Sequence, residues 1–258
     1  MTESRVTVEL DPAYSQLSEF AENIRDLFPQ SGTVIYQGRN TLKAFQSGGV
    51  SYVVKAFKVP HLINQISYGI FRPSKARRSY LYGKKLSELG ISTPSPIGYV
   101  EYRRFGLLWE SYYLCEQLHD VFEIREVFAD PRFADRANIL KAFAGFCHEL
   151  HSKDVLHFDF SAGNILIQKH DDTYKFSLVD VNRMEFIPLS TEQRIRSMAK
   201  LGSKAADSDI VAKYYAEAAS LDESSCVNRL RAEREAHWSK LERKNRLRGK
   251  SIRRPDDS

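Results

Sequence analysis

The spacing of hydrophobic residues predicts a strand-rich first part of the chain that also contains two helices. Residues 12–28 carry apolar side chains at helical intervals, which indicates an amphipathic helix. Residues 74–89 form a second helical stretch that ends before Gly90. The apolar positions of the first helix are Leu17, Phe20, Ile24 and Leu27. Turns at 38–40 and 48–49 separate β-branched and aromatic runs, which predict strands over residues 33–36, 42–45, 52–57, 97–102 and 112–117.

The pattern becomes mainly helical after Gln117. Residues 136–152 place their apolar side chains on one face and predict a long helix. Two short strands over 165–168 and 176–179 flank a polar turn, and helices are expected from Thr191 onward. The chain is therefore predicted to be an α+β protein with a β-rich N-terminal lobe over residues 1–117, a helical C-terminal lobe over 118–228 and a basic helical tail over 229–258.

The most specific chemical signal lies between residues 157 and 180. Asp159 and Asn164 stand five residues apart in HFDFSAGN, the spacing of the H-x-D-x-x-x-x-N loop of kinases. Asp180 follows the second short strand, so the hairpin would place it beside Asn164. Any one of these residues could simply cap a turn. Together they predict a protein-kinase-like two-lobe fold, with Asp159 as catalytic base and Asn164 and Asp180 as ligands of the Mg²⁺ that bridges ATP phosphates.

A lysine in the predicted strand 52–57 is the candidate for contacting the nucleotide phosphates. Lys55 stands among apolar strand residues, where a lysine must reach water or a partner. Lys58 is the competing candidate, but it lies three residues further and should point to the other face. Lys55 is therefore the preferred phosphate-binding lysine.

Two further segments are candidates for holding the nucleotide. No G-x-G-x-x-G or P-loop motif is present, and the turn Gly38-Arg39-Asn40 stands where a covering loop is expected. An ordinary hairpin turn explains the same residues equally well. The segment from Glu116 to Leu118, between the two predicted lobes, is the expected hinge whose backbone would hold adenine. That assignment depends on position alone.

Composition and charge are those of a soluble globular protein. Of the 258 residues, 42% are hydrophobic and 28% charged, and the three cysteines are too widely spaced for a disulfide framework or a zinc site. No secretory signal or membrane-spanning run is present, which favours the cytoplasm. Residues 229–254 carry eleven Lys/Arg against three Glu, a net charge of +8. Such a tail suggests an anionic partner, either phospholipid or nucleic acid, or simply a solvated helix.

Taken together, these segments resemble the lipopolysaccharide kinase (Kdo/WaaP) family, and in particular its Kdo-kinase-like branch, because Asn164 is present in the loop. The resemblance covers roughly residues 30–200, and the Asp-x-x-Arg ending that replaces D-F-G is its most family-specific feature. The residues that carry the resemblance are Lys55, 74–79, 90–96, 157–166 and 180–183.

The resemblance implies a kinase that uses ATP and Mg²⁺ to phosphorylate a sugar hydroxyl, of Kdo or heptose, in a lipid A-linked core oligosaccharide. It also implies a peripheral position on the anionic cytoplasmic face of a bacterial inner membrane, with no nucleic-acid partner expected. By position in the motif, Asp159 would be the base, Asn164 and Asp180 the metal ligands and Lys55 the phosphate-binding lysine.

One position departs from the kinase pattern. Kinases pair the strand lysine with a glutamate on the following helix. Residues 60–87 contain no acidic residue, and Ser79 and Leu81 stand where the partner is expected. Either Glu88 substitutes from the helix end, or Lys55 is held by Asp180 and the nucleotide.

The alternatives are a small atypical protein kinase, an aminoglycoside- or choline-type phosphotransferase, and a nucleotide-binding pseudokinase. About ten residues separate Asp180 from a predicted helix start at Ser190, and no A-P-E motif is present. Protein kinases have a longer activation segment, so a small or membrane-borne acceptor is favoured. Residues 61–71, with Arg72, Lys75, Arg77 and Arg78, offer a further hypothesis, an interfacial patch for an anionic acceptor; packing and a solvated helix explain them more simply.

Overall fold

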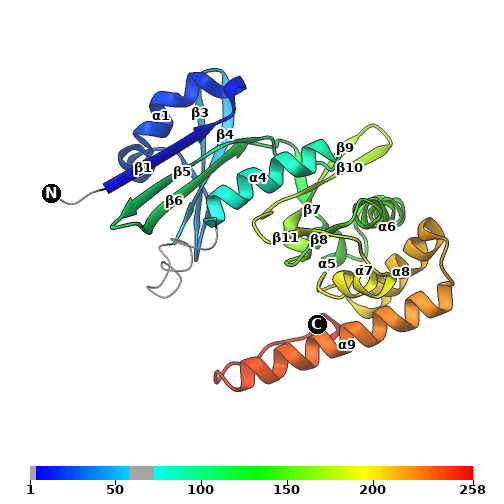
Figure 1. Cartoon of the computed structure of the whole chain (residues 1–258). Helices are drawn as coiled ribbons and strands as arrows, with labels where there is room; N and C mark the ends of the chain where they lie inside the picture. The colour runs from blue at the N-terminus through cyan, green and yellow to red at the C-terminus, as the bar shows by residue number, and fades with distance from the viewer. Residues whose placement is uncertain (1–3, 59–72, 258) are drawn as a thin grey trace. The chain divides into compact units, whose positions relative to one another are not determined.

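The computed structural model describes residues 4–58 and 73–257, which fall into two compact units divided between His119 and Asp120. Figure 1 shows the strands of the first unit in blue to green and the helices of the second in green to red. The described helices include none that is long and apolar enough to cross a bilayer.

The N-terminal unit is built on an antiparallel sheet of six strands. Neighbouring strands are hydrogen-bonded in the order β1-β5-β6-β4-β3-β2. The turn between β3 and β4 is Gly48-Gly49, and both glycines have positive φ, as a tight hairpin turn requires. The strands are β1 (Ser4–Leu10), β2 (Thr33–Gln37), β3 (Thr41–Ser47), β4 (Val50–Phe57), β5 (Pro96–Arg104) and β6 (Leu107–Glu116).

Helical segments supply a core to each face of this sheet. On one face, alternate strand residues such as Val54 and Leu114 pack with η1 (Pro12–Leu17), α1 (Ser18–Glu22) and α2 (Ile24–Gln30). On the other face, a smaller aromatic cluster packs against α4 (Lys75–Glu88). The members of this second cluster are Phe57, Ala76, Tyr80, Tyr99 and Tyr113.

The single helix predicted over residues 12–28 is three short segments, and its buried face is shifted by one position. The backbone leaves helical geometry at Asn23 (φ −101°, ψ 10°). Leu27, expected in the core, is 37% exposed, whereas the next residue, Phe28, is 7% exposed. Leu17 and Ile24 are buried as expected, and Phe20 packs edge-on against Phe45. Burial therefore follows the register Leu17, Ala21, Ile24, Phe28.

The strand β1 was missed in the sequence. Its residues alternate as Val6, Thr7, Val8, Glu9, Leu10, which is a strand pattern. Val6 and Val8 are 48% and 36% exposed, since β1 is an edge strand whose outer side is open. The alternation is short and its valines do not contribute to the core, so no strand was predicted for this segment.

Helix α4 begins as predicted and lies unusually close to the sheet. Ser74 is its N-cap, and its hydroxyl accepts the N–H of Arg77 at 3.0 Å. A Cβ at Gly83 would stand 3.2 Å from the Cβ of Pro96, closer than most side-chain contacts. Glycine at this position lets α4 approach β5.

The proposed interfacial patch is only partly within the described residues. Residues 61–72 lie outside them. Arg77 is exposed on α4, but Arg78 is 4% exposed. The prediction that Arg78 belongs to the patch is therefore wrong, because a buried guanidinium cannot contribute to an exposed cationic surface.

The C-terminal unit combines helices with two small antiparallel sheets. Strands β10 and β7 pair on either side of β9, and β11 pairs with β8. The helix predicted over 136–152 is α6, and Ser190 caps α7 with a reciprocal capping box to Gln193. The helices are α5 (Ile124–Ala129), α6 (Arg136–Ser152), α7 (Thr191–Met198), α8 (Ala205–Ala219) and α9 (Glu223–Arg246). The strands are β7 (Val121–Glu123), β8 (Val155–His157), β9 (Ile165–His170), β10 (Thr173–Leu178) and β11 (Met184–Phe186).

The basic C-terminal segment folds back on α9 (Figure 1). Arg254 forms an ion pair with Glu235 at 2.7 Å and another with Glu242. Asp256 accepts from Arg234 at 2.7 Å and from the N–H of Ala205 at 2.6 Å. Part of the positive charge of residues 229–254 is thus neutralised within the unit, so this region is a folded helix and return segment.

The buried histidine His151 joins three helices of this unit. Its Nδ1 lies 3.0 Å from the Tyr215 hydroxyl of α8 and its Nε2 lies 2.8 Å from Ser197 Oγ of α7. Ser197 Oγ donates to the Arg194 carbonyl, so it must accept from Nε2–H, and Tyr215 donates to Nδ1. Burial lowers the pKa of His151 to about 3.

The three cysteines are free thiols. Cys147 and Cys226 are buried, and the Sγ of half-buried Cys115 faces the Val53 carbonyl at 4.0 Å. Burial raises the pKa of Cys115 to about 12 and that of Cys226 to about 11, and it raises the pKa of Cys147 as well. These thiols are protonated near neutral pH and are poor nucleophiles.

Candidate active site

The loop that carries Asp159 is tied together by its own asparagine. The side-chain amide Nδ2 of Asn164 donates to the Asp159 carbonyl at 2.8 Å, and the Asn164 N–H donates to the Ser161 carbonyl at 2.9 Å. These bonds close the turn between β8 and β9. Because Nδ2 is used inside the loop, the carboxamide oxygen Oδ1 is the atom left for a ligand.

The Asp159 carboxylate is accessible and has a cation beside it. Its side chain is 50% exposed, and Oδ2 lies 3.9 Å from NH1 of Arg183. The Arg183 carbonyl accepts the N–H of Phe158 at 2.9 Å, which joins the segment after Asp180 to the residue before Asp159. An exposed carboxylate held on a fixed loop can accept a proton from a hydroxyl that approaches it.

His157 connects the catalytic loop to the segment that presents Asp180. The N–H of Asp159 donates to Nδ1 of His157 at 3.0 Å, and Nε2 lies 3.3 Å from the Val179 carbonyl. A carbonyl only accepts, so the ring is the neutral tautomer with its proton on Nε2. His157 is 1% exposed, and burial lowers its pKa, which keeps this tautomer neutral.

Asp180 is positioned by an unusual backbone and by its neighbours. Its φ is +55°, a left-handed conformation that is uncommon outside glycine and is often found at functional positions. The Val179 N–H donates to the Asn164 carbonyl at 3.0 Å, so the two expected metal ligands stand on bonded segments. Asn182 donates through Nδ2 to Oδ1 of Asp180. The structure therefore brings Asp159, Asn164 and Asp180 together, as the sequence predicted.

An apolar anchor holds the loop from beneath. Phe160 is 1% exposed, and its ring stacks on Phe143 of α6 at 6.4 Å between ring centroids. It also lies 6.3 Å from the ring of His157. Burial of Phe160 anchors the backbone directly after Asp159.

A cation that sequence reasoning missed also lies at this loop. The ammonium group of Lys200 donates to the Phe158 carbonyl at 3.1 Å. Lys200 follows α7, far from the motif in sequence, and no local pattern marked it. Only the folded unit brings it to the loop.

Of the site residues predicted in the N-terminal unit, Lys55 and Glu116 lie on strands of its sheet. Lys55 is on β4, opposite Leu42 of β3 and Tyr113 of β6, and thus on the face covered by α4. Its ammonium lies 5.4 Å from the centroid of the Phe57 ring. Its charge also lowers the pKa of Cys115, against the larger effect of burial.

Lys58 has a different environment. It follows the last residue of β4, is exposed, and its backbone N–H donates to Oδ1 of Asn40 at 3.3 Å. The turn that contains Asn40 connects β2 to β3, with Gly38 and Arg39 exposed at its tip. Gly38 has a negative φ, and its N–H donates to the Asn40 carbonyl at 3.1 Å. The predicted covering loop is therefore an ordered hairpin tip whose end is open to solvent.

The predicted hinge is anchored to the sheet up to Gln117. Glu116 donates its N–H to Ser95 and Gln117 donates to Ser51, both at 2.9 Å. The Glu116 side chain accepts from the Tyr14 hydroxyl at 2.8 Å, and burial together with this bond raises the pKa of Tyr14 to about 12. Among the described residues, no acceptor is bound by the N–H of Leu118. That N–H is the one a nucleotide base could use.

No carboxylate of α4 takes the place of the kinase helix glutamate. Ser79 is buried, and its hydroxyl donates to the Lys75 carbonyl, whereas Leu81 is 43% exposed. Glu88 pairs with Lys85 at 3.3 Å at the exposed end of the helix. Two partners for Lys55 are possible from the sequence. The structure does not support the first, in which Glu88 replaces the helix glutamate.

The donor atoms at the loop fit a hard divalent cation. An amide oxygen of Asn164 and the carboxylate of Asp180 are the oxygen ligands that Mg²⁺ prefers, with phosphate oxygens and water completing its shell. Neither here nor elsewhere in the described residues is a group of three or more His, Cys, Asp or Glu arranged to hold a metal. Two protein oxygens on bonded segments are what a kinase site provides.

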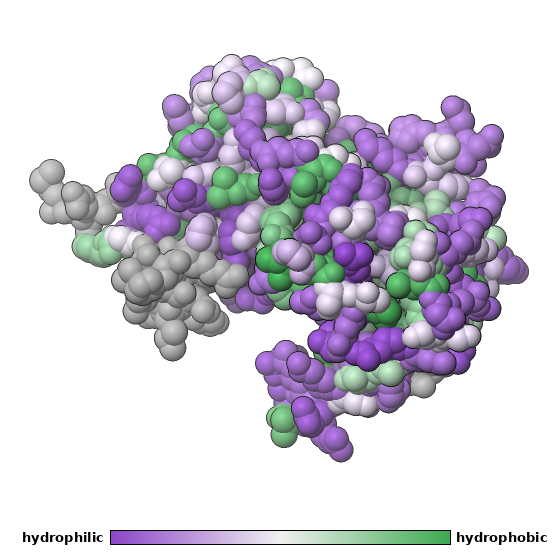
Figure 2. All heavy atoms as spheres, turned by 45° about the vertical axis from the view of Figure 1, so that its right-hand side comes forward, coloured by the Kyte–Doolittle hydropathy of each residue, from purple (hydrophilic) through white to green (hydrophobic). Residues whose placement is uncertain are grey.

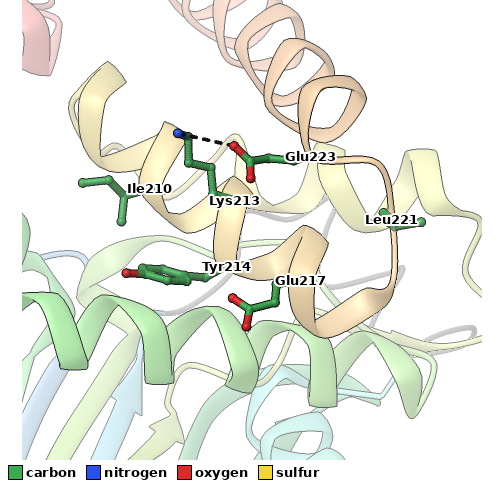
Figure 3. A pocket seen from close by; sticks show the side chains of 6 residues that line it. All are labelled: Ile210, Lys213, Tyr214, Glu217, Leu221 and Glu223. Carbon is green, nitrogen blue, oxygen red and sulfur yellow. Dashed lines mark ion pairs between the residues drawn. The ribbon is translucent and has the colours of Figure 1, made fainter.

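A separate hollow of about 500 Å³ lies between α8 and the start of α9 (Figure 3). An ion pair of 3.3 Å joins Lys213 to Glu223 at its rim. None of its lining residues belongs to the catalytic loop. They are Ile210, Lys213, Tyr214, Glu217, Leu221 and Glu223.

The fold is of the protein-kinase-like class, with a β-rich N-terminal unit and a helical C-terminal unit, and the constellation stands in the helical unit. The model of the lipopolysaccharide kinase (Kdo/WaaP) family matches residues 38–221. The chain belongs to this family.

Two comparisons with individual proteins agree with that membership. A 3-deoxy-D-manno-octulosonic acid kinase of Pasteurella multocida (strain Pm70) is 31% identical over 101 residues, which are 39% of this chain and 41% of that protein. The match thus spans less than half the length of the curated relative. A solved structure of WaaP in complex with acyl carrier protein superposes with a TM-score of 0.60 at 16% identity, covering 90% of this chain and 98% of that one. The superposition with WaaP shows that the two proteins share a fold.

Proposed function

We propose that the chain is an ATP-dependent kinase that phosphorylates a sugar hydroxyl, of Kdo or heptose, in the inner core of a lipid A-linked oligosaccharide. The observation that carries the proposal is the bonded constellation of Asp159, Asn164 and Asp180 in a chain of this family. The Kdo kinase relative supports Kdo as the first acceptor to test.

In the proposed reaction, the acceptor hydroxyl oxygen forms a bond to the γ-phosphorus of ATP while the bond to the β,γ-bridging oxygen breaks. The hydroxyl proton passes to the carboxylate of Asp159, and ADP leaves with the bridging oxygen. Asp159 orients the hydroxyl because its carboxylate is half exposed on a loop fixed by His157 and Phe160. Mg²⁺ on Asn164 and Asp180 would neutralise charge on the phosphates.

Residues of the N-terminal unit are proposed to bind the nucleotide. Lys55 contacts the α- and β-phosphates from the face of the sheet covered by α4. Gly38, Arg39 and Asn40 cover the phosphates, and the backbone of Glu116 and Leu118 holds adenine. The open hairpin tip and the N–H of Leu118 support these roles.

The short segment after Asp180 supports a sugar acceptor. Met184 of β11 pairs with His157 of β8, so this segment is held against the catalytic loop. Ser190 then starts α7 directly. A peptide-binding activation segment has no room here, which argues against a protein-kinase role.

An exposed cationic surface at the end of α9 supports attachment to an anionic membrane. We call this surface the basic end of α9, formed by Arg243, Lys244, Arg246, Leu247, Arg248 and Lys250. Leu247 is 83% exposed, and none of the five cations pairs with an acid in the part of the chain that is described. Figure 2 shows the projecting end of α9 as mainly hydrophilic with a small hydrophobic spot. Cations around an exposed leucine suit a bilayer surface at the inner face of the inner membrane.

The proposal is tested by supplying purified protein with labelled ATP, Mg²⁺ and lipid A precursors that carry Kdo or heptose. Phosphate transfer to the lipid-linked sugar that is lost in Asp159→Asn is the expected result. Parallel reactions with free sugars, aminoglycosides and casein detect the other acceptor classes. Transfer only to casein or aminoglycoside, or nucleotide-dependent thermal stabilisation without any turnover, contradicts the proposal.

A further inference from the structure

Lys200 reaches the catalytic loop from a segment outside the motif. It lies just after α7, in a turn closed by the bond of 3.1 Å from the Leu201 N–H to the Met198 carbonyl. Its ammonium donates to the Phe158 carbonyl at 3.1 Å and lies 5.8 Å from the centroid of the Phe158 ring. Phe158 immediately precedes Asp159, so the ammonium is fixed beside the proposed base.

The charges that act on Lys200 are those of Asp159, Lys240 and Arg196. Burial lowers its pKa, and the charge of Asp159 opposes that effect. Lys240 and Arg196 lower the pKa of Lys200 further. Arg196 is itself paired with Glu192 and Glu233, so Lys200 is the partly buried cation here that can attract a further anion.

Anchoring the loop does not require the Lys200 side chain. The backbone N–H of Ala162 donates to the Leu201 carbonyl at 3.3 Å, which already ties this turn to the loop. An ammonium has three donors, and in the described residues only the Phe158 carbonyl accepts one. Two donors are left beside Asp159.

The catalytic loop itself supplies no cation, since residues 157–164 contain neither lysine nor arginine. A phosphoryl group in transit carries negative charge on three oxygens, and kinases stabilise it with cations placed in advance. Arg183 and Arg125 are the other cations near the loop, but Arg183 is paired with the Asp159 carboxylate and Arg125, beside Gly163, is paired with Glu123. Lys200 is directed to the loop by a backbone carbonyl and keeps its charge available.

We propose that Lys200 is a catalytic residue whose ammonium contacts the phosphoryl group as it passes from ATP to the hydroxyl held by Asp159. This inference deepens the proposed kinase function and rests on it. The charge of Lys200 stabilises the transferring phosphoryl group more than it stabilises bound ATP. Its loss therefore lowers kcat and leaves the affinity for nucleotide nearly unchanged.

The test compares Lys200→Gln and Lys200→Met with the wild-type chain. Glutamine keeps an N–H donor for the Phe158 carbonyl but has no charge, so it separates tethering from charge. Both variants are expected to lower kcat by about 10²- to 10³-fold, with KM for ATP within about threefold of the wild type. Lys200→Arg restores part of kcat. Lys240→Met, which removes a neighbouring lysine from α9, is the matched control and keeps wild-type kcat.

A binding measurement adds a readout that a structural role would not change. ADP with Mg²⁺ and aluminium fluoride imitates the phosphoryl group in transit. Its affinity is expected to fall in Lys200→Gln, whereas that of ADP alone is unchanged. Wild-type kcat in Lys200→Gln, or equal losses for both ligands, overturns the role of Lys200 while leaving the kinase proposal intact. A wild-type chain that transfers no phosphate to any acceptor overturns the kinase proposal itself.

Discussion

The amide nitrogen of Asn164 donates to the carbonyl of Asp159 over 2.8 Å, and this bond sets the direction of the whole asparagine side chain. Its oxygen must then point away from the loop backbone. The residue that closes the loop is therefore the same one whose oxygen is proposed to bind a metal ion, and one bond positions both the proposed base and the proposed ligand.

Asn164→Ala is expected to weaken metal use more than nucleotide binding. The substitution removes a proposed Mg²⁺ ligand and the bond that closes the loop. The Mg²⁺ concentration for half-maximal activity should rise at least about tenfold. Mutating a residue that only hydrogen-bonds to a metal ligand already lowers metal affinity by about that factor. Titrating activity with Mg²⁺ at saturating ATP measures it. Asn138→Ala, on the exposed start of α6, is the control, and an unchanged Mg²⁺ requirement in Asn164→Ala would remove Asn164 from the site.

His157→Leu is expected to destabilise the C-terminal unit and disorder the loop. Leucine fills similar space but leaves the Asp159 N–H and the Val179 carbonyl without their partner. Each buried polar group left unpaired costs about 1–3 kcal/mol of unfolding free energy. Urea unfolding measures the loss. His170→Leu, at the exposed end of β9, should change stability by less than about 0.5 kcal/mol.

Acid should destabilise the protein through His151. The folded pKa of about 3 lies below the ordinary value of 6.5, so the unfolded chain binds the proton more readily. The contribution of neutral His151 to the free energy of unfolding is complete above pH 6.5. It is lost as the pH falls toward 3, by up to about 1.4 kcal/mol per pH unit. The urea midpoint measured from pH 8 to pH 4 should fall more steeply in wild type than in His151→Gln. Parallel curves would show that protonation of His151 does not cause the loss of stability in acid.

Lys55→Met is expected to raise KM for ATP and lower kcat/KM by about tenfold or more, because a phosphate-binding cation is lost. Lys58→Met is the matched control, since Lys58 is exposed beyond the end of β4 and contacts Asn40 only through its backbone. Steady-state kinetics with ATP distinguish the two. A larger effect of Lys58→Met than of Lys55→Met would make Lys58 the phosphate-binding lysine.

Arg254→Ala should release the return segment from α9. The guanidinium joins Glu235 and Glu242, which lie about two turns apart on the helix. Amide hydrogen exchange over residues 250–257 should become faster while the catalytic loop is unaffected. Arg248→Ala, at the exposed basic end of α9, is the control; equal exchange in both variants would show that Arg254 does not hold the segment.

The parts of the site that the sequence predicted are those encoded by local spacing. Asp159, Asn164 and Asp180 lie within one loop and one hairpin, so their juxtaposition follows from short-range geometry. Lys55 was placed on the correct strand, and its face follows from the alternation of β4. The fold class followed from the same signals, because the two parts of the chain differ in hydrophobic period.

What the sequence did not reveal depends on contacts between distant segments. Lys200 reaches Phe158 across 42 positions of sequence, and His157 joins two loops through a carbonyl that any residue possesses. The shift from Leu27 to Phe28 at the core arises because the helix breaks at Asn23. Neither a tertiary contact nor a break of this kind has a periodic signature.

The raised pKa values of Cys115, Cys147 and Cys226 have a practical use for spectroscopy. Maleimide dyes and spin labels react with thiolates, and these three thiols offer almost none near pH 7. One exposed cysteine introduced into each unit, for example at Glu19 and at Asp171, would therefore be labelled ahead of the native thiols. Distances between such labels, measured with and without nucleotide, would report whether the separation of the two units changes when nucleotide binds.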